Sequence, residues 1–88
     1  MWTLDIIVGL LDKHHQRATY GAVAGLMGTA PRSVMQGRRR DWFNSWVVNQ
    51  DTGLPSEYPE PMIHPAIRER PTILSDAAAL VRWLDDAH

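Results

Sequence analysis

Residues 19–40, TYGAVAGLMGTAPRSVMQGRRR, constrain the fold of this chain more than any other stretch. Thr19 carries a hydroxyl group that can cap a helix, and the apolar residues after it recur at helical spacing. Gly28 can end that helix in a left-handed conformation, and Pro31 suits the first position of a following helix. We therefore expect two short helices joined by a tight turn, the second running from Pro31 to about Arg38.

This order of helix, glycine turn and polar, basic helix is the layout of a helix-turn-helix. The alternative is that the two helices simply pack together in an ordinary small α domain. In the helix-turn-helix interpretation, one set of side chains presents a recognition face to bases and a second set contacts phosphates. The recognition set is Arg32, Ser33 and Gln36, and the phosphate set is Arg17, Arg38, Arg39 and Arg40.

The charge of the chain is distributed unevenly, although the net value is only −1. Residues 1–50 contain six basic and three acidic residues, whereas residues 51–88 contain three basic and seven acidic residues. The positive half coincides with the expected helix-turn-helix, which favours a nucleic-acid interface there. Because the acidic half repels phosphate, we expect modest, salt-sensitive binding.

Size and composition limit the number of domains and the kinds of site that this chain can have. With 88 residues the chain fits a single domain, and its 44% apolar content is typical of a folded one. It contains no cysteine, which excludes a disulfide framework, zinc–thiolate site and thiol nucleophile. No apolar run is long enough for a bilayer, and no cleavable leader is evident, so we expect a cytoplasmic protein without a membrane partner.

Two amphipathic helices are expected at the ends of the chain. Residues 2–15 have a capping Thr3 and an apolar stripe, and residues 75–88 have a capping Ser75 and a similar stripe. The terminal helix either packs on the domain or serves as a dimer element. Just before it, residues 71–74, P-T-I-L, are expected to form a short strand.

Residues 41–58 have a different character, because strand-forming side chains precede a turn-rich sequence. Trp42, Phe43 and Trp46 lead into two valines, and a return strand through Leu54 and Tyr58 would complete a hairpin. Such a wing would give an α+β fold: a winged helix-turn-helix-like three-helix core with a small β wing and an additional C-terminal helix. The aromatic cluster is either the core beneath the wing or a platform for stacking bases.

We divide the single domain, residues 1–88, into a core at 1–54, a docked proline-rich segment at 55–74 and the terminal helix at 75–88. In the middle segment, His64 with Glu60 or Glu69 lacks a third ligand at useful spacing. We therefore expect no metal and no cofactor.

Residues 4–53 resemble the C-terminal DNA-binding domain of the O6-alkylguanine-DNA alkyltransferases, and more closely their cysteine-less relatives, the alkyltransferase-like proteins. The resemblance is carried by T-Y-G-A-V-A at 19–24, by P-R-S-V at 31–34 and by V-V-N at 47–49 before Gly53. It implies a winged helix-turn-helix. It also implies that Tyr20 lies near the phosphate 3′ to a flipped base and that Arg32 enters the duplex through the minor groove.

On the same alignment, Asn44, Ser45 and Trp46 stand where the family has its reactive cysteine, histidine and arginine. These three residues would line the base pocket. Without nucleophile or base, alkyl transfer is excluded, and no other catalytic constellation is evident. We expect a non-catalytic, alkyltransferase-like protein of DNA repair that binds duplex DNA. The alternative is a protein–protein interaction or structural module that reuses the winged-helix fold.

Overall fold

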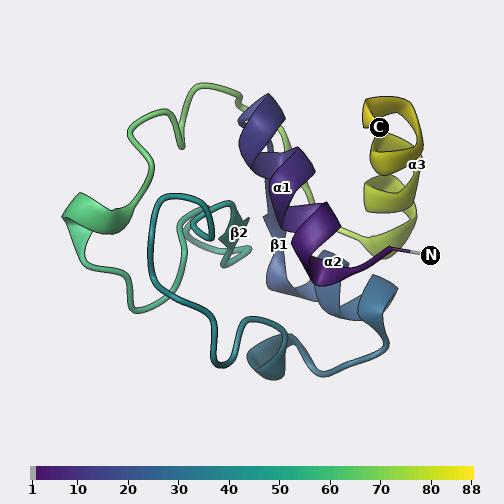
Figure 1. Ribbon diagram of the computed structural model, residues 1–88, viewed down its shortest axis with the longest axis horizontal. Coiled ribbons are helices and arrows are strands. Elements are labelled where there is room, and N and C mark those ends of the chain that lie inside the picture. The colour runs from purple at the N-terminus through teal and green to yellow at the C-terminus, as the bar shows by residue number, and fades with distance from the viewer. Residues whose placement is uncertain (1) are drawn as a thin grey trace.

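The computed structural model describes residues 2–88, so Met1 of the expected domain lies outside the described residues. The chain forms an α+β fold with three helices and a small three-stranded parallel sheet (Figure 1). The elements are α1 Leu4–His14, β1 Arg17–Thr19, α2 Tyr20–Met27, β2 Val47–Val48, β3 Ile73–Leu74 and α3 Ala77–Ala87, with 3₁₀ helices η1 Pro31–Ser33 and η2 Glu60–Met62.

The helix boundaries follow from local capping. Thr3 Oγ1 accepts a hydrogen bond from Ile6 N at 3.2 Å, and Thr19 Oγ1 accepts one from Ala22 N at 3.0 Å. Gly28 ends α2 with φ of 72°, as the sequence predicted. The cap of α3 differs from the prediction, because the side chain of Asp76 rather than Ser75 accepts from Ala79 N.

The sheet has the order β2-β1-β3, and both outer strands run parallel to β1. Ala18 pairs with Val47 on one side and with Leu74 on the other. The short strand expected at residues 71–74 is therefore present in its second half only, as β3. Because β1 runs directly into α2, the sheet fixes where α2 begins and which segments lie beside its first turn (Figure 1).

A single apolar core joins the three helices and the three strands. Most of the expected stripe of α1 and the two leucines of the expected stripe of α3 are buried in it. Ile67, with 2% of its surface exposed, anchors the proline-rich segment to the same core. Among residues 2–88, no helix combines the length and the apolar character needed to cross a membrane. The fully buried side chains include Ile7, Val8, Leu11, Val23, Trp46, Val47, Val48, Leu80 and Leu84.

The second helix of the predicted helix-turn-helix is much shorter than expected. Instead of running from Pro31 to about Arg38, the helical part is the single 3₁₀ turn η1, and turns follow it. Gly37 has φ of 82°, a left-handed conformation that interrupts a right-handed helix at this point. The arginine run, defined as Arg38, Arg39 and Arg40, therefore lies in irregular chain.

The β wing is likewise not confirmed. Both Val47 and Val48 are buried, so β2 lacks the alternation of a solvent-facing wing and pairs with β1 instead. Residues 49–54 form a tight turn, in which Gly53 N donates to Asn49 O at 2.8 Å. No antiparallel pair occurs within residues 2–88.

The aromatic cluster splits into one core residue and two surface residues. Trp46 is fully buried, and its Nε1 donates to Asp12 Oδ1 at 2.9 Å. Trp42 and Phe43 are 49% and 40% exposed. The interpretation of this cluster as core therefore holds for Trp46 alone.

Candidate nucleic-acid interface

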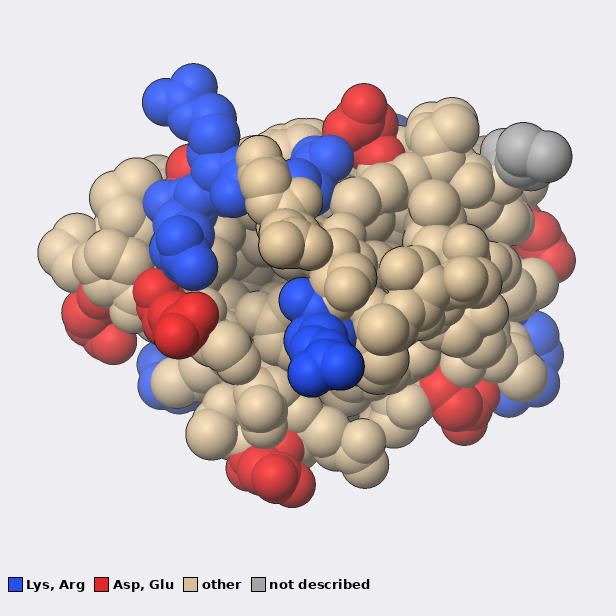
Figure 2. All heavy atoms as spheres, turned by 90° about the horizontal axis from the view of Figure 1, so that it is seen from below, with Lys and Arg blue, Asp and Glu red and all other residues tan. Residues whose placement is uncertain are grey.

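A cleft of about 710 Å³ lies between the start of α2, residues 31–40 and the turn at 49–58. Figure 2 shows this face, with Lys and Arg side chains on two sides of a hollow and acidic side chains at its edge. The lining includes most of the residues that the sequence nominated for DNA contact. They are Tyr20, Arg32, Gln36, Arg38, Arg39, Arg40 and Asn44.

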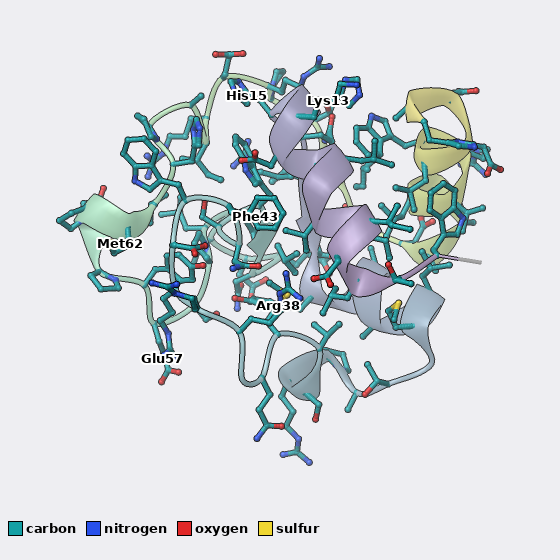
Figure 3. The ribbon with its side chains drawn as sticks, viewed as in Figure 1. Lys13, His15, Arg38, Phe43, Glu57 and Met62 are labelled. Atoms are coloured by element: carbon teal, nitrogen blue, oxygen red, sulfur yellow. The ribbon has the colours of Figure 1, made fainter. Side chains whose placement is uncertain are left out.

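The four arginines of the cleft differ in whether they already form ion pairs within the protein. Arg38 Nη1 lies 2.8 Å from Asp5 Oδ1, and its Nε donates to Asn44 Oδ1 at 2.8 Å, so this side chain is held in place (Figure 3). Arg40 Nη2 lies 3.6 Å from Glu57 Oε2, and both side chains are largely exposed.

Arg32 and Arg39 are exposed, and neither forms an ion pair within the described part of the chain. Solvent-exposed guanidinium groups without a carboxylate partner can meet an external anion with no internal contact to break. The cleft therefore offers two free guanidinium groups, one loosely paired group and one fixed group.

Two tyrosines fix the wall opposite η1. Tyr20 Oη accepts a hydrogen bond from Ser56 N at 2.9 Å, and Tyr58 Oη donates to Asp41 O at 3.1 Å. Burial, and next the nearby charge of Asp41, raise the pKa of Tyr58 to about 12. Tyr58 is consequently protonated near neutral pH and cannot serve there as a base.

The base pocket expected from the family resemblance is not brought together. Only Asn44 reaches the cleft, and 6% of the residue's surface is exposed. Its side chain forms hydrogen bonds with both Arg38 and Asp41. Ser45 and Trp46 are fully buried outside the cleft lining, and Ser45 Oγ is bonded to Trp42 O and His64 N.

Two further residues of the expected contact set lie elsewhere. Ser33 is exposed on η1 but does not line the cleft. Arg17 is 8% exposed, and its guanidinium donates to Gly53 O and Arg70 O, each at 2.9 Å. Burial and then the charge of Arg68 lower the pKa of Arg17. Its side chain therefore holds two loops together and does not face a ligand.

Sequence reasoning missed the wall formed by residues 49–58. Six residues of that wall line the cleft in addition to the nominated set: Asn49, Gln50, Asp51, Ser56, Glu57 and Tyr58. The turn-forming composition of 49–53 signalled a loop, but nothing local signalled that the parallel pairing of β2 with β1 brings this loop beside Tyr20.

Histidine and tryptophan rings gather away from the cleft. The ring of His15 stacks on Trp46 with centroids 5.2 Å apart, and His64 lies 4.9 Å from His15. His15 Nδ1 also lies 3.3 Å from Glu69 Oε1. Within residues 2–88, no three His, Asp or Glu side chains are grouped so that they could hold a metal ion.

Comparison of the chain with protein-family profiles, curated proteins and solved structures found no match.

Proposed function

We propose that this chain binds duplex DNA in the arginine-lined cleft, without catalysing a reaction. The observation that carries the proposal is the convergence of Arg32 and the arginine run on one cleft. Two of these four guanidinium groups have no carboxylate partner among residues 2–88. A row of exposed guanidinium groups suits phosphates, which accept paired hydrogen bonds from this fork-shaped donor.

The nominated polar residues that line the cleft have different roles in this proposal. Arg39 and Arg40 contact phosphates, and Gln36 belongs to the same cleft lining. Tyr20 Oη accepts from Ser56 N, which leaves its own proton to donate to a phosphate oxygen. Arg38 supports the wall through Asp5 and Asn44.

The resemblance to alkyltransferase-like proteins supplies a finer version of the proposal. In this version the fold is a divergent winged helix-turn-helix, in which α2, the Gly28 turn and η1 keep the order of the motif. Arg32, exposed on η1, enters the minor groove and offsets part of the cost of unstacking a base. The process would be DNA repair in the cytoplasm.

The test compares two charge-equivalent variants by fluorescence anisotropy on labelled duplex. Arg32 lines the cleft, whereas Arg82 is exposed on α3, outside the cleft. We expect Arg32→Ala to weaken duplex binding about tenfold and Arg82→Ala to leave it nearly unchanged. Duplexes with and without O6-methylguanine, together with single-stranded DNA, separate lesion recognition from general binding. Equal losses in the two variants would contradict the proposal.

A protein-interaction module is the second candidate, and exposed apolar side chains favour it. Ile6, Trp42, Phe43 and Met62 are between 37% and 49% exposed. Large apolar side chains on a surface are often contact points for a partner. A partner recovered by affinity capture whose cross-links cover the arginine run, together with no duplex binding, would support this alternative over DNA binding.

A further inference from the structure

Glu57 and Arg40, which both line the cleft, form an ion pair. Glu57 Oε2 lies 3.6 Å from Arg40 Nη2, and the two side chains are 84% and 55% exposed. Figure 3 shows Glu57 projecting from the outer edge of the molecule. An ion pair this exposed contributes little stability, because water and salt screen it. An anion that contacts other cations of the cleft at the same time can therefore replace the carboxylate at small cost.

The backbone conformation of Glu57 is unusual, and the exposed ion pair with Arg40 does not explain it. Glu57 has φ of 59°, a left-handed conformation that non-glycine residues rarely adopt. The residues on both sides are tied down, since Ser56 N donates to Tyr20 Oη and Tyr58 Oη donates to Asp41 O. Backbone strain of this kind persists where the surroundings hold it, and it is concentrated at functional sites.

We infer that Glu57 is an internal competitor for the anion site at Arg40, and that it sets which anions the cleft accepts. The carboxylate occupies the position that a DNA phosphate takes on binding. A phosphate of the backbone displaces it, because neighbouring phosphates engage Arg39 and Arg32 at the same time. A small monovalent anion has only the one contact and does not displace the tethered carboxylate.

This inference rests on the proposed function, since it assigns a specificity-determining role within the same cleft. It makes a distinct prediction about charge. Removing the carboxylate should strengthen binding, whereas removing any of the cleft arginines should weaken it. The gain should depend on Arg40, the only cation that Glu57 contacts as an ion pair among residues 2–88.

The experiment measures duplex binding by fluorescence anisotropy for Glu57→Gln and for Glu60→Gln as its matched control. Glu60 is also exposed, and the substitution changes the net charge equally, but Glu60 lies on η2 outside the cleft lining. We expect Glu57→Gln to bind about threefold more tightly than the unsubstituted chain, a size set by exposed ion pairs. We expect Glu60→Gln to change the affinity much less.

A second pair of proteins, in which Glu57→Gln and Glu60→Gln are each combined with Arg40→Ala, isolates the contact between Glu57 and Arg40. In an Arg40→Ala background, Glu57→Gln should no longer improve binding beyond the gain that Glu60→Gln gives. Duplex binding with equal gains for Glu57→Gln and Glu60→Gln would overturn the inference and leave the proposed function standing. A gain that survives in the Arg40→Ala background would overturn the inference as well. No duplex binding by any of these proteins at low salt would overturn both.

Discussion

The helices and the cleft-bearing loops of this molecule are stabilised in different ways. The helices α1, α2 and α3 have side-chain caps and bury apolar stripes in the shared core. Residues 31–72 contain only two strand residues and two 3₁₀ turns. Side chains at positions 16 and 17, in the sheet and just before it, donate to carbonyl groups of those loops. Further side-chain hydrogen bonds join the loop segments to one another.

Gln16 and Arg17 show how the second arrangement works. Gln16 Nε2 donates to Thr72 O at 2.9 Å, and Arg17 donates to Gly53 O and Arg70 O. Gly53 approaches so closely that an added Cβ would lie 2.9 Å from Arg17 Nη1. The loop that forms the 49–58 wall is therefore attached to the domain by buried polar contacts, while the helices are held by apolar burial.

The largest effect should come from the helices. Leu80 on α3 is fully buried, so Leu80→Ala removes apolar contacts and leaves a cavity. We expect the free energy of unfolding to fall by about 3 kcal/mol. Urea denaturation measures it, with exposed Arg82→Ala on the same helix as the control. A loss no larger than that of the control would show that apolar burial is not what stabilises the helices.

A smaller and more local effect should follow from Arg17→Met, which keeps a long side chain but removes the guanidinium. The carbonyl groups of Gly53 and Arg70 then lose their donor, which costs about 1–3 kcal/mol in total. Amide hydrogen exchange should accelerate in residues 49–58 and 70–74 and change little in α1 and α3. Equal acceleration in the helices would contradict the distinction between the two regions.

The smallest effect concerns Tyr58 and pH. Its pKa is raised to about 12 from an ordinary 10.0, so the unfolded chain loses this proton first as the pH rises. The stabilising contribution is therefore fully present below about pH 10 and is lost as the pH approaches about 12. In Tyr58→Phe, the free energy of unfolding should fall less steeply over that range. Parallel pH profiles for the two proteins would contradict the assignment.

The sequence was informative wherever structure is set by neighbours along the chain. Thr3, Thr19 and Gly28 act as predicted because capping involves residues within one helical turn. The parallel sheet could not be predicted, because strands of two or three residues carry no clear alternation and pair with distant segments. The length predicted for the second helix was wrong: its helical part ends at Ser33, and Gly37 takes a left-handed conformation that a right-handed helix could not continue through.

The candidate site likewise contains residues that the sequence revealed and residues that only long-range contacts place there. The arginine run was found because consecutive basic residues are visible in any sequence, and Arg32 was found because it follows Pro31 at the start of the expected second helix. In the sequence, Arg17 could not be distinguished from the arginines of the cleft. Only its hydrogen bonds to Gly53 O and Arg70 O show that its side chain belongs to the interior. The 49–58 wall was missed because long-range pairing places it.

The salt dependence of duplex binding tests the central claim most directly. Each phosphate contact contributes about −0.9 to the slope of log affinity against log salt concentration. Replacing both free guanidinium groups, in Arg32→Ala with Arg39→Ala, should make that slope shallower by about two units. Arg82→Ala should leave the slope unchanged. An unchanged slope in the double variant would contradict phosphate binding by the arginine-lined cleft.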